Sequence, residues 1–112
     1  MIGIVRSGQW SEGGKTAFEI LGEDHGAAVT LILEDMPRGG GPRLHKHPYG
    51  ETWVVTGGRA AFTNGPETLE AGTGDVIYVA AGTPHKFTSV GEVPLKMVCI
   101  HQSPHFVTEW LE

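Results

Sequence analysis

The 112-residue sequence has little cysteine, little positive charge and no long apolar run. Its single cysteine excludes an internal disulfide and a thiolate cluster held by one chain, and it fits a reducing, cytoplasmic compartment. Lys and Arg total 8 against 13 Asp and Glu, so a net charge of −5 argues against nucleic acid or an anionic membrane as partner. The apolar runs fall far short of the roughly 20 residues that span a bilayer, and the N-terminus lacks the features of a signal peptide.

Glycine and proline are plentiful, with 17 and 7 residues, and they separate short runs rich in β-branched and aromatic residues. Such runs predict strands at 28–33, 52–56, 76–79 and 95–102. Asn64-Gly65 predicts a hairpin turn, whereas helical spacing is absent from every window of about 11 residues. Length and pattern together predict one all-β domain, over residues 1–112, built as a sandwich or barrel.

A group of histidines carries the first chemical signal. His45 and His47 are two residues apart, so on a strand both imidazoles face one side while Lys46 faces away. Glu51 opens the next predicted strand and His85 follows a Gly-Thr-Pro turn, so both can reach the same point. Three imidazoles and one carboxylate suit a divalent transition metal: iron, manganese, nickel, zinc or copper. The alternative is a pair of surface histidines.

Two segments resemble the conserved motifs of the cupin superfamily. The first motif, G-x5-H-x-H-x3-E-x6-G, is matched at the family's spacing by Gly39, His45, His47, Glu51 and Gly58. The second is matched in most positions by Gly74, Gly82 and His85. Ala80 stands where the family has proline and Ser89 where it has asparagine, and neither position is a metal ligand.

This resemblance implies a small single-domain cupin, whose fold is a double-stranded β-helix, or jelly-roll barrel. It also implies that His45, His47, Glu51 and His85 are the ligands of one divalent metal ion. Cupins commonly form homodimers, often by exchanging N-terminal strands. Residues 2–6 are therefore a candidate exchange strand, although they can also simply fray.

Strand alternation extends the site to a pocket of mostly apolar and aromatic side chains. The residues placed in it are Arg43, Tyr49, Trp53, Val55, Phe87, Met97 and Cys99. Arg43 either binds an anionic substrate or faces solvent at the barrel mouth, and Tyr49 either flanks the metal or packs. His101 is either an acid–base group or a hydrogen-bonded histidine at the barrel end. Cys99 is interpreted as a packed side chain, and His25 and His105 as surface residues.

These observations predict a metal-dependent enzyme that acts on a small organic molecule. The first hypothesis is oxygenation or oxidative C–C cleavage, because four protein ligands leave open positions for substrate or O₂. The second is Lewis-acid isomerisation, cyclisation or hydrolysis of a sugar-like or polyketide substrate. The third is a small-molecule-binding module without catalysis. The fold alone does not decide among them.

Overall fold

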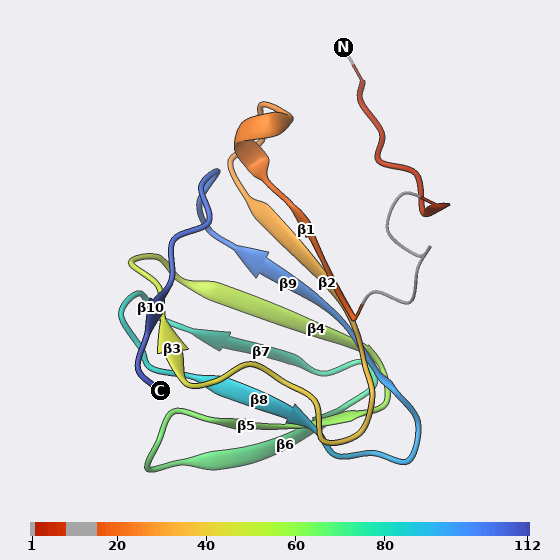
Figure 1. Ribbon diagram of the computed structural model, residues 1–112, viewed down its shortest axis with the longest axis vertical. Coiled ribbons are helices and arrows are strands. Elements are labelled where there is room, and N and C mark those ends of the chain that lie inside the picture. The colour runs from red at the N-terminus through yellow and green to blue at the C-terminus, as the bar shows by residue number, and fades with distance from the viewer. Residues whose placement is uncertain (1, 9–15) are drawn as a thin grey trace.

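The computed structural model describes residues 2–8 and 16–112, and within them the chain forms ten strands and a short 3-10 helix, η2 (Gly22–Asp24) (Figure 1). The strands are β1 (Ala17–Ile20), β2 (Thr30–Met36), β3 (His45–Lys46), β4 (Glu51–Gly57), β5 (Arg59–Thr63), β6 (Thr68–Gly72), β7 (Val76–Val79), β8 (Lys86–Ser89), β9 (Leu95–His101) and β10 (Glu109–Trp110). The four predicted strands and the Asn64-Gly65 hairpin turn are confirmed. No described helix is long and apolar enough to cross a bilayer.

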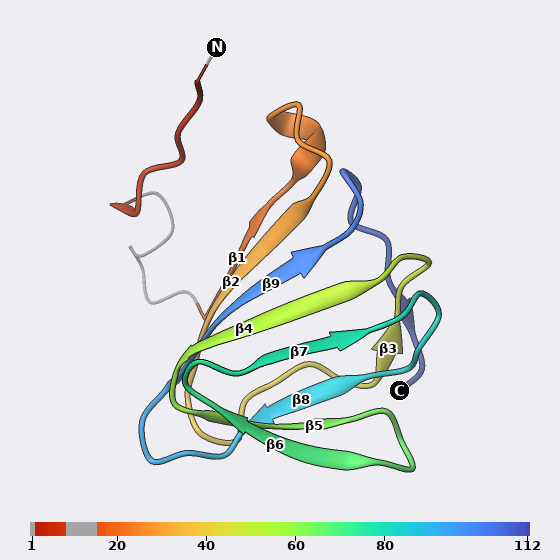
Figure 2. The ribbon, with the colours of Figure 1, turned by 180° about the vertical axis from the view of Figure 1, so that it is seen from behind.

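Two sheets face each other (Figures 1 and 2). The first has five strands in the order β1-β2-β9-β4-β7. The second is built from β6-β5-β8 and from β10-β3, and a bridge between His45 and His85 connects these two parts. All the strand pairs are antiparallel. This arrangement is the predicted double-stranded β-helix, or jelly roll.

The core lies between the sheets, because alternate residues of each strand point inward. In β4 and β9 the inward residues are buried and the outward ones are more exposed. The buried apolar side chains come from both sheets: Trp53, Val55, Ala60, Phe62, Ala71, Phe87, Leu95, Met97 and Cys99. Outside the barrel, residues 2–8 lie apart from the sheets in both views, with Ile2 99% and Ile4 68% exposed.

Gly58 is where the chain leaves the first sheet and enters the second. Its φ of 76° lies in the left-handed region that other residues rarely adopt. A Cβ added there would also lie 2.7 Å from the carbonyl oxygen of Pro94. Glycine at this position thus lets β4 continue directly into β5.

We expect Gly58→Ala to lower the free energy of unfolding by about 2 kcal/mol or more, because it combines backbone strain with a steric contact. The matched control is Gly57→Ala, whose added Cβ would make an ordinary 3.5 Å contact with Lys96. Urea unfolding of the two variants measures the difference. Equal stabilities would contradict the role given to Gly58.

Candidate metal centre

Four predicted site residues meet at one end of the space between the sheets. Glu51 is the first residue of β4, and His45 opens β3, where it pairs with His85 through two backbone hydrogen bonds of 3.1 and 2.8 Å. His47 follows β3, and its carbonyl accepts a hydrogen bond from the backbone N–H of Gly82, in the turn before His85. One nitrogen or oxygen atom from each of the four buried side chains lies within 4.8 Å of the others. The group has the size and donor set to hold a metal ion.

The three imidazoles are oriented by hydrogen bonds to backbone carbonyls. The Nδ1 atoms of His45, His47 and His85 lie 2.7, 2.8 and 2.8 Å from the carbonyl oxygens of Arg43, Val107 and Thr83. An Nδ1–H that donates to a carbonyl leaves the lone pair of Nε2 free to bind a metal. Burial is the main cause that lowers the pKa of His45, which favours this neutral form.

Glu51 is the negative charge at the centre of the group. Its Oε1 lies 3.0 Å from Nε2 of His47 and 3.2 Å from Nε2 of His85. Burial raises the pKa of Glu51, but the neighbouring imidazoles of His101, His47 and His85 outweigh it and hold this pKa well below its usual range. The carboxylate is therefore ionised at neutral pH.

Three atoms of this group are buried without a hydrogen-bond partner among the described residues: Oε1 of Glu51 and Nε2 of His47 and of His85. Buried polar atoms are costly when they are unpaired. Here all three atoms are electron-pair donors that converge on one point. A divalent cation would satisfy them together, so the residues present fit a metal ion.

His101 supports Glu51 from the neighbouring strand. The register of β4 on β9 places the two residues opposite each other, and Nε2 of His101 lies 3.2 Å from Oε2 of Glu51. Its Nδ1 lies 2.7 Å from the hydroxyl of Tyr49, whose ring stacks on His47. The hydroxyl of Tyr49 also accepts a 3.3 Å hydrogen bond from the backbone N–H of Val107. Both ring nitrogens of His101 thus have partners within the protein.

Comparison with known proteins places the chain in a family. The family described as the cupin domain matches residues 32–101. The chain belongs to the cupin family. An uncharacterized protein of Methanocaldococcus jannaschii is 40% identical over 90 residues, which cover 78% of this chain and 72% of that protein. An uncharacterized protein of Streptomyces coelicolor is 40% identical over 58 residues, or 52% of this chain and 54% of its own length.

Solved structures share the fold of this cupin. A Klebsiella pneumoniae protein with a double-stranded β-helix domain has a TM-score of 0.77 at 16% identity, with 97% of this chain and 96% of that chain covered. Oxalate decarboxylase of Bacillus subtilis, studied for its Mn(II) centres, has a TM-score of 0.77 at 26% identity. The match covers 90% of this chain and 29% of the decarboxylase.

A cavity of about 280 Å³ opens in front of His45, His47 and Glu51, and we call it the histidine cavity. Trp53, Phe87, Cys99 and His101 line it, as the strand alternation predicts. Apolar and aromatic side chains form most of its remaining wall: Ile32, Met36, Phe106 and Trp110. The cupin thus combines a polar group of ligands with a largely apolar chamber.

Four residues predicted to line the pocket lie elsewhere, and Tyr49, whose ring stacks on His47, is one of them. Val55 and Met97 face inward but sit deeper in the barrel, where the two sheets pack without a cavity. Arg43 precedes β3 and is exposed; its guanidinium lies 4.7 Å from the ring centre of Trp110. It also hydrogen bonds to the main-chain oxygen of Glu112 at 3.3 Å. These predictions are wrong because strand alternation gives the face on which a side chain lies and not its depth in the barrel. It also does not apply to Arg43, which lies before β3 begins.

The remaining residues that the sequence analysis singled out are packed or exposed side chains rather than reactive groups. Tyr49 packs on His47 beside the cavity, and His25 and His105 are exposed. Burial, followed by the charges of Glu34 and Glu51, raises the pKa of the Cys99 thiol well above its usual value. The thiol therefore stays protonated, which makes it a poor nucleophile.

The C-terminal segment supplies cavity residues that the sequence did not indicate. β10 pairs with β3 and places Trp110 opposite His45, with ring centres 5.1 Å apart. The ring of Phe106 lies 5.2 Å from that of His101. A two-residue strand paired across more than sixty positions leaves no periodic signal in the sequence.

Glu34 is the other residue of the cavity that sequence reasoning missed. It lies on the inner face of β2, and its Oε2 atom is enclosed without a hydrogen-bond partner among the described residues. Burial, with a smaller contribution from the charge of Glu51, raises its pKa to about 7. Glu34 comes directly after the predicted strand 28–33, and the sequence shows neither that β2 continues to Met36 nor which of its faces points inward.

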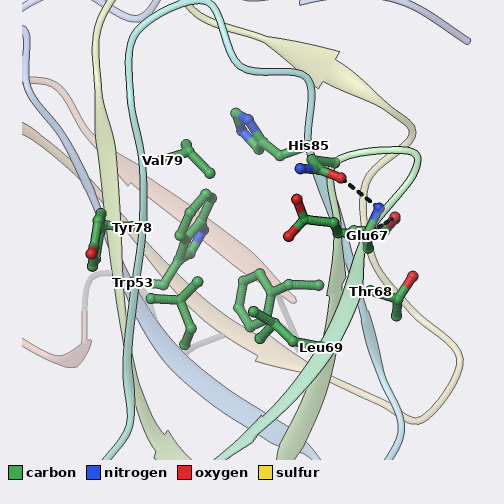
Figure 3. A pocket seen from close by; sticks show the side chains of 11 residues that line it. Trp53, Glu67, Thr68, Leu69, Tyr78, Val79 and His85 are labelled. Carbon is green, nitrogen blue, oxygen red and sulfur yellow. Dashed lines mark hydrogen bonds between the residues drawn. The ribbon is translucent and has the colours of Figure 1, made fainter.

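A second hollow, of about 180 Å³, lies on the other side of Trp53 (Figure 3). It is bounded by β5, β6 and β7, and its wall includes Leu69, Tyr78 and the ring of His85. Trp53 lines both spaces. The indole therefore closes the histidine cavity on the side that faces β6 and β7.

We expect His47→Ala to reduce bound transition metal from stoichiometric to trace amounts, because it removes one converging lone pair. The matched control is His25→Ala, which alters an exposed histidine outside the cavity. Elemental analysis of both purified variants measures the metal content. Full occupancy in the His47 variant would show that the site is misassigned.

The raised pKa of Glu34 predicts how stability depends on pH. Between the usual carboxyl value of 4.5 and its folded value of about 7, the folded state binds more protons than the unfolded state. Stability therefore falls as pH rises through this window. Between about pH 5 and pH 8, the wild type should lose about 2 kcal/mol more than Glu34→Gln.

Urea unfolding of the metal-free protein measures this difference. The control is Glu19→Gln, because Glu19 lines the same cavity but is exposed. Its stability should follow that of the wild type across the pH range. Parallel curves for the wild type and the Glu34 variant would contradict the raised pKa.

Proposed function

We propose that this cupin is a metal-dependent enzyme that acts on a small, partly apolar organic molecule. His45, His47, Glu51 and His85 would hold one divalent transition-metal ion, and the reaction would be oxygenation or oxidative C–C cleavage. The observation that carries this proposal is the set of buried, unpartnered atoms Oε1 of Glu51 and Nε2 of His47 and of His85, beside the histidine cavity. Such donors are the ones that imidazole- and carboxylate-binding metals use.

When bound, the ion would supply a site for O₂ or a substrate oxygen to bind and become polarised. The protein's own residues prepare that site. Carbonyl hydrogen bonds fix the three imidazole rings, and His101, held by Tyr49, orients Oε2 of Glu51. Phe87, Phe106 and Trp110 give the chamber aromatic walls. We therefore assign His101 as a positioning residue in place of the acid–base role predicted for it.

The identity of the ion is part of the proposal. The N/O donor set suits iron, manganese, nickel, zinc or copper, and an all-sulfur site is excluded. The likeness to an oxalate decarboxylase with Mn(II) centres supports manganese, and redox chemistry with O₂ would also be served by iron. Cys99 also lines the cavity, but its protonated thiol does not favour ligation.

A second candidate is Lewis-acid chemistry at the same site, without O₂. The likeness at 26% identity to a decarboxylase supports a reaction other than oxygenation. Oxalate itself fits the chamber poorly, because none of the described lining residues is Lys or Arg and two of them are Glu34 and Glu19. Sugar-like or polyketide substrates would be the class to test. Binding of a small molecule without turnover is the remaining alternative.

The proposal extends to assembly. We propose a homodimer in which the exposed N-terminal segment, with Ile2 and Ile4, contacts a second copy of the chain. The support is the exposure of these two apolar side chains, 99% for Ile2 and 68% for Ile4. The proposed role of the protein involves no nucleic acid and no membrane.

Oxygen dependence separates the two candidates. We expect iron(II)-loaded protein to consume O₂ when a panel of small apolar molecules with two metal-binding oxygens is added, measured with an oxygen electrode. The His47→Ala variant should consume none above background. Conversion of a panel member at the same rate under argon would contradict oxygenation and favour Lewis-acid chemistry.

A further inference from the structure

Glu34 places a second carboxyl group in the histidine cavity. It projects from β2 between the inward-facing Ile32 and Met36, so apolar side chains flank it. Its Oε1 lies 4.0 Å from the Sγ atom of Cys99, while its Oε2 is enclosed and has no partner among the described residues. An enclosed carboxylate oxygen without a partner is costly, unless a ligand donates a hydrogen bond to it.

Each of the other titratable groups of the cavity is paired, turned toward the proposed metal, protonated or exposed. They are Glu19 on β1, His45 and His47 at β3, Glu51 on β4, and Cys99 and His101 on β9. Glu51 lies against three imidazoles, its Oε1 faces the proposed metal, and both ring nitrogens of His101 have partners. The imidazoles of His45 and His47 are turned toward the proposed metal, the thiol of Cys99 stays protonated, and Glu19 is exposed. Among the described residues of the cavity, Glu34 is left as the enclosed acceptor that neither the protein nor the proposed metal engages.

The rest of the wall indicates what can bind beside Glu34. Phe87, Phe106 and Trp110 present aromatic surface, and the described lining contains no Lys or Arg to neutralise an anion. A ligand that enters as an anion would meet Glu34 and Glu51 without a compensating side chain. A neutral, flat molecule with a hydroxyl group can pack against these aromatic rings and donate a hydrogen bond to Glu34.

We propose that Glu34 is the proton acceptor of the histidine cavity and that its substrate is a neutral hydroxylated aromatic molecule. The substrate O–H bond breaks, its electron pair stays on the oxygen, and the proton forms the carboxylic acid of Glu34. The resulting oxyanion would be stabilised by the metal ion that His45, His47, Glu51 and His85 would hold. This assignment rests on the proposed function, because the cation is what stabilises that oxyanion.

The electrostatics of the cavity are consistent with this role. Burial raises the pKa of Glu34 to about 7, whereas the pKa of Glu51 is held low. Two carboxyl groups with different pKa values can take different roles. Glu51 stays ionised, and Glu34 exchanges a proton near neutrality. Glu51 would thus bind the metal, and Glu34 would accept the proton of the substrate.

Catechol binding to the zinc(II)-loaded protein tests the proposal without turnover. At about pH 8 free catechol keeps its protons, since phenols ionise near pH 10. Calorimetry in two buffers of different ionisation enthalpy gives both the affinity and the number of protons released. We expect Glu34→Gln to release about one proton more than the wild type, and to bind catechol roughly ten- to hundred-fold more weakly.

The matched control is Glu19→Gln, which should bind catechol and release protons as the wild type does. Equal proton release and affinity in the wild type and Glu34→Gln, with zinc retained in both, would overturn the role of Glu34 alone. A zinc-loaded wild type that does not bind catechol would overturn the substrate class. A wild type that holds no zinc would overturn the proposed function, and this assignment with it.

Discussion

The buried carboxylate of Glu51 is the charge on which the rest of the site depends. Removing an ionised group from water is costly, so it persists only where several partners compensate for it. The β4–β9 register brings His101 to one oxygen, and His47 and His85 are brought to the other. Backbone carbonyls then fix the rotation of the imidazole rings. The jelly roll thus places four donors around one point before any ligand arrives.

Environment gives the two carboxyl groups of the cavity opposite properties. Hydrogen bonds keep Glu51 ionised, while apolar neighbours and the charge of Glu51 favour the neutral form of Glu34. The aromatic wall contributes to both effects, because charges interact more strongly beside apolar groups than in water. The C-terminal segment contributes to this wall through Phe106 and Trp110, and its Val107 carbonyl orients His47. The candidate metal ligands and the wall of the histidine cavity therefore come from the same few strands and the C-terminal segment.

The sequence predicted the fold and the grouping of His45, His47, Glu51 and His85, because these depend on local spacing and on recognisable motifs. Alternation also placed Trp53 and His101 correctly, since β4 and β9 are long and regular. It misplaced Val55, because periodicity gives the face of a strand and not the depth along the barrel. Trp110 reaches the cavity only through pairing between β10 and β3, which no local pattern records.

X-ray absorption at the metal edge of protein purified without added metal tests whether His45, His47, Glu51 and His85 bind a metal ion. We expect one first-row transition metal per chain, with imidazole and oxygen scatterers and no sulfur in the coordination sphere, although Cys99 lines the same cavity. A sphere that contains sulfur, or one without imidazole scattering, would contradict the assignment of His45, His47, Glu51 and His85 as the ligands.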